Sequence, residues 1–508
     1  MILVGELSLW VALLMAAWGA VVSFAGGALQ RRDLAASGRR ALYVAFAALV
    51  VATSGVVTAL IERDFSLAYV AMHTNLALPQ AYAVSALWSG PAGAMLVWAL
   101  ALAGCVALLA PGGATRDRSR GPWTAGVSAT LLLFVLLVVC VQANPYERLS
   151  WRAPDGRGLD PRLLQPVMVL HQPLLILGYV ALSMPFVLTM GGLLARRLDA
   201  AWASSARRWA LAGWTCLAGG LLLGARGSAA ASPTGGWGWS SGEGVALGVW
   251  VVATGLLHTL ARTPARGLLV KWNSILSALV ALGALAGAYA LAASGGAPAF
   301  RAAWVGGGVV CAAAAVWSIA SRAPTVTVEP SAAGPRRRRV GEFVAHAAAL
   351  VLVVALAAGA FSGARDMTLA TGQEAQVADP FGHVWRFVSQ GTSRYSTADH
   401  DVVALSLDAS RDGIRQGLLV AEQWQYRDAL GDSLYAPITR VGVRSSPTLD
   451  ARAVLLAASA DEAQVRITFV PLAVWAWIGG GLVVLGGVLA LWPRTTPAGR
   501  PSTRDADA

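Results

Sequence analysis

The chain has 508 residues, of which 56% are hydrophobic and only 13% are charged. This balance excludes a single soluble domain and indicates a protein that crosses a membrane several times. The net charge of +12 comes almost wholly from arginines in short clusters between apolar runs. Such clusters are typical of topology signals, so we expect contact with membrane lipid and no binding of nucleic acid.

Eleven apolar runs are candidates for crossing a bilayer, whose core of about 30 Å takes roughly 20 helical residues. The first is interpreted as a retained helix and not a cleaved signal, because Glu6 precedes it and no basic segment does. The run at 209–224 is the shortest. The runs lie near 8–28, 41–61, 91–110, 123–142, 171–194, 209–224, 243–261, 273–293, 304–321, 343–361 and 470–492.

The basic clusters predict how these spans are oriented. A cluster follows each odd-numbered span, so all clusters lie on one side, which the positive-inside rule makes cytoplasmic. The N-terminus is therefore expected outside and the C-terminus inside. The outer loop 143–170 also holds four arginines, which we interpret either as a site for an anionic ligand or as solvated charge. The clusters include Arg31, Arg32, Arg39, Arg40, Arg116, Arg118, Arg120, Arg196, Arg197, Arg207, Arg208, Arg262, Arg266, Lys271, Arg336 to Arg339 and Arg494.

Residues 362–469 have the pattern of a separate domain outside the membrane. Short runs alternate apolar and polar residues at 402–408, 417–421, 439–444 and 464–469, and Asp412-Gly413 is a hairpin signal. The predicted fold class is thus an all-α polytopic membrane protein of about 11 transmembrane helices, with a small antiparallel β domain on the outer face. We expect the helical core at 1–361, the final transmembrane helix at 470–492 and a disordered cytoplasmic tail at 493–508.

A tryptophan-rich outer loop at 225–243 precedes the seventh span. Trp237 and Trp239 alternate with glycines there, and Glu243 opens the helix that follows. Tryptophan often anchors a protein at the membrane surface, and acids are favourable at helix N-termini, so each feature also has a structural interpretation. The glycines favour a binding function, because they let backbone approach a flat apolar ligand closely.

Two histidines lie at matched depth inside the membrane. His258 precedes Arg262 by four residues, roughly 6 Å along a helix, and His346 follows Arg339 by seven, roughly 10 Å. Helices of opposite direction therefore place two imidazoles close to the inner surface, as ligation of a haem iron between helices requires. The alternative is that each histidine hydrogen-bonds a neighbouring helix. His171 begins the fifth span at its outer end, and His73, His383 and His400 are interpreted as surface residues.

Several stretches together resemble one family, the CcmF-type cytochrome c haem lyases of the haem-handling WWD-domain group. The stretch 144–185 (NPYERLSWRAPDGRGLDPRLLQPVMVLHQPLLILGYVALSMP) is similar to the family's NPF-R, DG-GLNPLLQ-P and HPPLLY-GY run nearly end to end. The stretch 78–98 is similar to LP-YR-AA-WGGHEGSLLLW. Other sections of the family are similar, in the same order, to residues 249–272, 342–372 and 465–481. The resemblance therefore covers most of the chain.

The resemblance implies roles for individual residues. His171 falls on the first outer ligand of haem iron, and His258 and His346 fall on the two transmembrane ligands of a b-type haem. Trp237, Trp239 and Glu243 fall on the WWFWDPVEN motif, in the outer loop on which haem lies. The implied cofactor is haem b, and the implied metal ligands of haem iron are His258, His346 and His171.

The chain also departs from the family pattern. Ser240-Ser241 replaces Asp-Pro and Gly244 replaces Asn in the tryptophan motif, and 294–300 has no histidine where the second outer ligand is expected. Pro91-Ala92-Gly93 replaces HEG. The chain also lacks helices that the family usually has between the ninth and tenth spans. We therefore expect an intact b-haem site and an impaired outer site, in a divergent and shortened member of the family.

The function implied by the resemblance is cytochrome c biogenesis in the inner (plasma) membrane, with the β domain on the periplasmic or extracytoplasmic side. The chain would be a haem lyase or a subunit of one, attaching haem to the CxxCH motif of an apocytochrome by thioether bonds. Expected partners are apocytochrome c, a haem chaperone and other cytochrome c maturation subunits. One alternative is a non-catalytic haem-holding or docking subunit, which the missing histidine favours. A transporter is the other, but the spans offer almost none of the carboxylates it needs.

Overall fold

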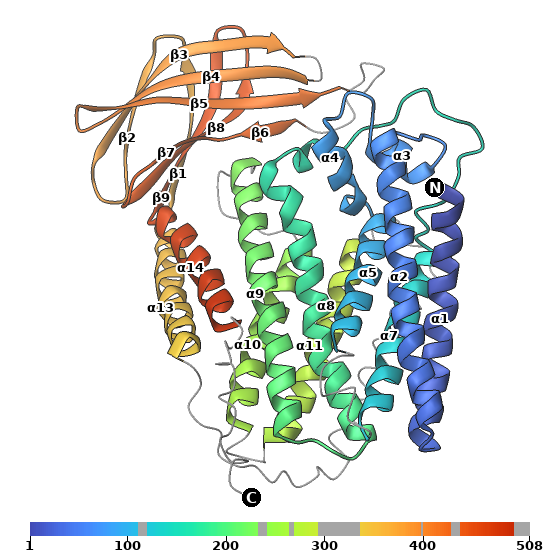
Figure 1. Cartoon of the computed structure of the whole chain (residues 1–508). Coiled ribbons are helices and arrows are strands. Elements are labelled where there is room, and N and C mark those ends of the chain that lie inside the picture. The colour runs from blue at the N-terminus through green and yellow to red at the C-terminus, as the bar shows by residue number, and fades with distance from the viewer. Residues whose placement is uncertain are drawn as a thin grey trace, which may run out of the picture.

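The computed structural model describes residues 1–109, 119–231, 241–263, 269–292, 336–397, 400–427 and 437–491. Within these ranges, a bundle of long helices carries a β domain at one end, and the N-terminus lies at that same end (Figure 1). This arrangement confirms the predicted fold class of a helical membrane protein with a small antiparallel β domain. The predicted span at 304–321 and the predicted tail at 493–508 lie outside the described residues.

Long helices of the described chain coincide with the other predicted spans. Nine of them are long and apolar enough to cross a membrane, and α9 is not among these, because arginines flank its apolar stretch on both sides. The long helices are α1 (Ile2–Ala28), α2 (Arg32–Glu62), α5 (Pro91–Leu109), α7 (Gly121–Val141), α8 (Pro166–Leu194), α9 (Ala200–Ala231), α10 (Ser241–Arg262), α11 (Leu269–Ala292), α13 (Arg336–Ala358) and α14 (Ala473–Leu491). Short helical segments are α3 (Ala68–His73), α4 (Gln80–Ser85), η1 (Ala86–Trp88), η2 (Pro161–Leu163) and η5 (Gly359–Phe361).

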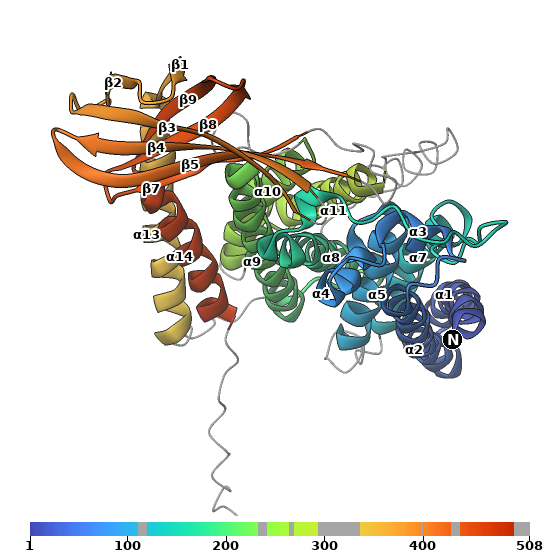
Figure 2. The same cartoon turned by 90° about the horizontal axis from the view of Figure 1, so that it is seen from above.

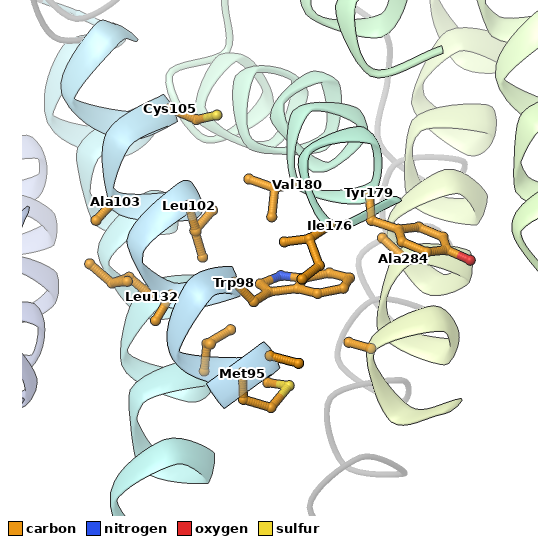
Figure 3. Packing of buried hydrophobic residues seen from close by; sticks show 14 of the residues in the cluster. Met95, Trp98, Leu102, Ala103, Cys105, Leu132, Ile176, Tyr179, Val180 and Ala284 are labelled. Carbon is orange, nitrogen blue, oxygen red and sulfur yellow. The ribbon is translucent and has the colours of Figure 1, made fainter. Parts of the chain in front are cut away.

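The centre of the bundle is formed by α5, α7, α8 and α11. Figure 3 shows Trp98 of α5 beside residues of α8, and its ring lies 5.6 Å from that of Tyr179 at an interplanar angle of 21°. Gly287 of α11 makes room for Tyr179, because a Cβ there would lie 2.4 Å from the tyrosine ring. In a membrane, helices associate through such close packing because lipid tails are as apolar as the side chains.

The pair α13–α14 lies at one side of the bundle, next to α9, with the β domain above it (Figure 2). Two glycine stripes let α14 fit between its neighbours. A Cβ on Gly479 or Gly486 would lie within 2.8 Å of α13 backbone, and one on Gly480 or Gly487 within 2.6 Å of α9 side chains. α14 therefore packs closely against both α13 and α9.

Replacement of Gly486 by alanine is expected to destabilise this three-helix contact. The new methyl group would lie 2.6 Å from a backbone nitrogen of α13, and overpacking of this kind typically costs about 1–3 kcal/mol. Gly481 in the same helix is the matched control, because no atom lies within 4 Å of its added Cβ. Thermal unfolding of the purified protein in detergent should show a lower midpoint for Gly486→Ala only. Equal midpoints for the two variants would contradict the packing argument.

The β domain consists of two antiparallel sheets among the described residues, with strand orders β1-β9-β8-β7 and β2-β3-β4-β5-β6. Trp385, Phe387 and Phe469 lie at the centre of the apolar core that the sheets enclose. The strands are β1 (Gly363–Ala370), β2 (Glu374–Ala378), β3 (Val384–Ser396), β4 (His400–Arg411), β5 (Ile414–Tyr426), β6 (Ile438–Arg440), β7 (Gly442–Ser445), β8 (Leu449–Ala458) and β9 (Glu462–Pro471).

The four alternating runs in the sequence all lie in strands. Asp412 and Gly413 form the two-residue turn between β4 and β5, with φ of 47° and 82°, as the hairpin signal predicts. The run 439–444 differs from a single strand, since β6 pairs with β5 and β7 pairs with β8. The chain crosses between the sheets at Gly442, where a Cβ would lie 2.7 Å from the carbonyl oxygen of Val420.

Candidate functional site

His258 of α10 and His346 of α13 lie face to edge across the space between their helices. Their ring centres are 5.8 Å apart and their planes meet at 84°. Both side chains are exposed at the protein surface, so neither imidazole belongs to the packed core. The structure therefore brings together the two histidines that the sequence placed at matched depth.

Hydrogen bonds fix the same tautomer on both rings. The Nδ1 atom of His258 lies 2.8 Å from the carbonyl oxygen of Thr254, and that of His346 lies 2.6 Å from the carbonyl oxygen of Glu342. Because a carbonyl oxygen can only accept, each Nδ1 carries the proton and donates it. Each Nε2 therefore remains as the ring nitrogen that can bind a metal.

The spacing of the pair is compatible with an iron between the rings. Two metal–imidazole bonds of roughly 2 Å place the coordinating nitrogens about 4 Å apart. The ring centres lie behind those nitrogens and must be farther apart, and the observed separation of 5.8 Å meets this condition. The donor set of two neutral imidazoles also suits haem iron in a low-spin state.

A stripe of glycines on α10 leaves room for a bulky group beside His258. Gly244, Gly248 and Gly255 lie on the same face of α10 as His258. A Cβ added to any of them would meet no atom within 4 Å. Close helix packing explains the glycines at the α8–α9 and α13–α14 contacts. It does not explain the three glycines of α10, where an added Cβ would contact no other described helix. Each glycine costs a helix about 1 kcal/mol relative to alanine, so the stripe fits a planar ligand on α10 that needs this space.

At the end of the bundle nearer the β domain, His171 of α8 meets α9 and α10. Its Nδ1 lies 2.8 Å from the carbonyl oxygen of Gly220, and its Nε2 lies 3.5 Å from Oε1 of Glu243. Both side chains are 7% exposed. Gly224 is required for this contact, because a Cβ there would lie 1.9 Å from that carboxylate oxygen. The structure thus joins His171 to Glu243, as two of the predicted outer-site residues.

A cavity of about 60 Å³ opens beside His171. Trp88 of η1, Leu159, Leu163 and Met168 form its apolar walls, with Ser85, Ser89 and Gln172 as the polar residues. Ligand sites for small molecules usually measure about 300–1,000 Å³, so this cavity alone does not hold a porphyrin. The tryptophan loop was predicted at 225–243, but residues 225–231 belong to α9 and residues 241–243 to α10. The part between them, with Trp237 and Trp239, lies outside the described residues.

The remaining histidines differ in part from the surface positions expected for them. His383 is exposed, whereas His73 is half-buried, stacks on Tyr69 with ring centres 4.3 Å apart and lies against Gly90. Burial lowers the pKa of His73, which favours its neutral form. His400 is half-buried and stacks on both Trp424 and Tyr426 in the β domain. Arg148 lies 4.0 Å from Glu6, and the other three arginines of the loop 143–170 are exposed.

Sequence analysis missed the residues that support the imidazoles. Glu342 accepts hydrogen bonds from Arg207 and Arg338, and Thr254 accepts one from Trp214. Glu342 and Thr254 each stand four residues before a histidine, the spacing at which a helical side chain reaches back to the preceding turn. That spacing could have identified these two, but nothing in the sequence links Arg207 or Trp214 to them.

Comparisons with known proteins point to cytochrome c biogenesis. The family model described as "Cytochrome C assembly protein" matches residues 88–288. "Cytochrome c-type biogenesis protein CcmF" of Pseudomonas aeruginosa is 34% identical over 275 residues, which cover 54% of this chain and 42% of that protein. "Probable cytochrome c-type biogenesis protein NrfE" of Escherichia coli is 35% identical over 238 residues, covering 47% and 43%. The chain thus spans less than half the length of these relatives.

A solved structure named "Cytochrome c Heme Lyase CcmF" shares the fold. The TM-score is 0.80 at 19% sequence identity, and the match covers 97% of this chain and 98% of that chain. The two proteins therefore have the same overall architecture, the β domain included. The helices α10 and α13, which carry the histidine pair, are thus part of a fold that a solved structure also has.

Proposed function

We propose that this chain, which is similar to CcmF-type proteins of cytochrome c biogenesis, holds haem b between His258 and His346. We further infer that it contributes to the attachment of haem to apocytochrome c. The observation that carries the first proposal is the pair of imidazoles, whose ring centres are 5.8 Å apart and whose Nδ1 atoms are each bonded to a backbone carbonyl. The open glycine stripe beside His258 supports it.

In this proposal His258 and His346 have a different role from the outer residues. Haem b, when bound, would supply one-electron transfer to the iron of the substrate haem. His258 and His346 would hold haem b through Nε2, because Nδ1 of each ring is bonded to a backbone carbonyl. His171, Glu243, Trp237 and Trp239 would hold the substrate haem at the outer end, with His171 as one ligand of its iron.

The proposed chemistry is addition of a thiol to a vinyl group of the substrate haem. Each cysteine thiol of CxxCH adds across one carbon–carbon double bond, so that sulfur bonds to one carbon and a proton goes to the other. The addition is redox-neutral and needs no oxidant, provided that the cysteines are not paired as a disulfide. The chain's own contribution would be to hold the porphyrin against the apocytochrome and to supply one axial ligand.

The proposed setting is the bacterial inner membrane, with the β domain on the periplasmic or extracytoplasmic side. The β domain, the N-terminus and the beginning of α8 lie at one end of the bundle, and the α1–α2 connection lies at the other end (Figure 1). His171 stands in the second turn of α8, and Arg31 and Arg32 stand where α1 leads into α2. The positive-inside rule supports that second end as cytoplasmic. Apocytochrome c, a haem chaperone and other maturation subunits would then meet the chain at its outer face.

A non-catalytic haem-holding or docking subunit is the second candidate function. Nε2 of His171 faces Glu243 at 3.5 Å in a cavity of about 60 Å³, which is too small for a porphyrin. No histidine stands at 294–300, where the family's second outer ligand is expected. This candidate retains the haem b site and assigns attachment of haem to a complete lyase beside the chain.

The purified protein is expected to carry a low-spin b-type haem. Expression in cells with sufficient haem, followed by purification in detergent, should yield about one haem per chain by pyridine haemochrome assay. Acidic acetone should extract this haem, because it is held through iron and not through thioether bonds. The reduced-minus-oxidised spectrum should have the sharp bands of two histidine ligands. A protein that is folded and pure but free of haem would overturn the proposal.

A further inference from the structure

The two candidate iron ligands stand on helices that have little direct contact with each other. α10 packs mainly against α9 and α11, whereas α13 packs mainly against α14. Only 11% of the apolar window of α13 is buried within the protein. The separation of the two imidazoles must therefore be set through other elements. The hydrogen bonds on the two sides lead to one helix, α9.

An ion pair links His346 to α9. The Nδ1 atom of His346 donates to the carbonyl oxygen of Glu342, and the carboxylate of Glu342 accepts from Nη2 of Arg207 at 2.7 Å. Arg207 stands on α9, and its side chain is only 17% exposed. Arg338 holds the same carboxylate oxygen from within α13 at 3.0 Å. The turn of α13 that orients His346 is thereby tied to α9.

A tryptophan links His258 to the same helix. The Nδ1 atom of His258 lies 2.8 Å from the carbonyl oxygen of Thr254, and the hydroxyl of Thr254 accepts from Nε1 of Trp214 at 2.8 Å. The ring of Trp214 also stacks on that of Trp250, with centres 5.0 Å apart and planes at 22°. Stack and hydrogen bond together fix the rotation of α10 about its axis relative to α9.

Arg207 and Trp214 are seven residues apart, which places them on one face of α9 about 10.5 Å apart along its axis. One helix thus contacts the turn before each histidine. We propose that Arg207 and Trp214 are positioning residues that set the separation and the mutual angle of His258 and His346. This inference rests on the proposed function, since it assigns a role to residues around the haem that the two histidines would hold.

Matched variants separate positioning from simple packing. Arg207→Met removes the ion pair, and Trp214→Phe keeps an aromatic ring but loses the N–H donor. Arg208→Met is the control for the first, because Arg208 is a neighbouring arginine whose side chain bonds only Ser205 of its own helix among the described contacts. Trp202→Phe is the control for the second. Trp202 is buried on α9 and donates to Thr189 of α8, an equivalent bond away from the histidines.

The first readout is the ferric low-spin spectrum of the bound haem, because electron paramagnetic resonance responds to the angle between the two imidazole planes. Arg207→Met and Trp214→Phe should shift or broaden the signal of the near-perpendicular geometry. They should also weaken haem retention, by up to about tenfold for Arg207→Met, the lower range for loss of a group that orients a ligand. Arg207→Lys should restore much of the retention. The two control variants should keep the wild-type signal.

A second readout does not depend on haem. Spin labels at Val251 of α10 and Leu350 of α13, which are 58% and 70% exposed, report the distance between the two helices in a chain without its native cysteines. Arg207→Met and Trp214→Phe should broaden that distance distribution, and the controls should not. Wild-type distances and wild-type spectra in both variants would overturn the inference. Absence of haem from every protein would instead refute the proposed function, and the label distances would still decide the positioning role.

Discussion

Replacement of His258 or His346 by alanine is expected to abolish the spectrum of the bound b-type haem. Each imidazole is one of two axial ligands in the proposed site, and its loss leaves an iron with a single protein ligand. Such an iron becomes high-spin and exchanges readily, so haem should be lost during purification. The measurement is the reduced-minus-oxidised absorbance per mole of purified chain.

Two controls make the loss specific. His383→Ala removes an exposed imidazole of the β domain, where it is bonded to Asp412, and should leave the haem spectrum unchanged. Free imidazole added to His258→Gly should restore part of the low-spin spectrum, because the ring then occupies the space that the side chain has left. Gel filtration in detergent checks that each variant remains folded. Full and unchanged spectra in both alanine variants would rule out His258 and His346 as iron ligands.

The helices and strands of this fold could be predicted from the sequence wherever a periodic pattern exists. Apolar runs identified the long helices, and alternation identified β4, β5 and β9 because one face of each is buried more deeply than the other. The pattern failed at β8, where residues Leu449 to Leu455 are all buried. A strand buried on both faces has no alternation, so composition alone does not distinguish it from a buried helix.

For the candidate inner site, the sequence predicted only the depth of His258 and His346 in the membrane. The distances of His258 from Arg262 and of His346 from Arg339 predicted how far each ring lies from the membrane surface. The partners that hold the rings were not predictable in this way. Glu342 and Arg207 are 135 residues apart, and Trp214 and Thr254 are 40 apart. Which arginine or tryptophan faces which helix depends on helix packing, and no spacing in one chain records it.

The outer site was predicted from resemblance more than from pattern, and the structure explains one limit of that approach. The resemblance implied His171 as a ligand of haem iron, and in the structure its Nε2 faces the carboxylate of Glu243 at 3.5 Å. The contact depends on Gly224, where any Cβ would clash with Glu243. A glycine that makes room for a pair of side chains from two other helices carries no local signature in the sequence.

The chain supplied alone is expected to support little thioether formation. Its proposed outer site has His171 as one ligand and no second histidine at 294–300, and Ser240-Ser241 replaces Asp-Pro in the tryptophan motif. One axial bond, together with a cavity of about 60 Å³ beside His171, should hold the substrate haem weakly. The yield of c-type cytochrome should therefore rise when a full-length lyase or a haem-delivering chaperone is present.

The assay is cytochrome c maturation in a bacterial strain that lacks its own lyase, measured as covalently bound haem in the cytochrome fraction. The strain carrying this chain alone should give a small fraction of the yield of a strain carrying a complete lyase, and His171→Ala should remove what remains. Co-expression with a complete lyase whose outer histidines are intact tests the docking role, since added yield would then depend on His258 and His346 of this chain. A full yield from the chain alone would show that one outer histidine suffices and that the outer site is not impaired.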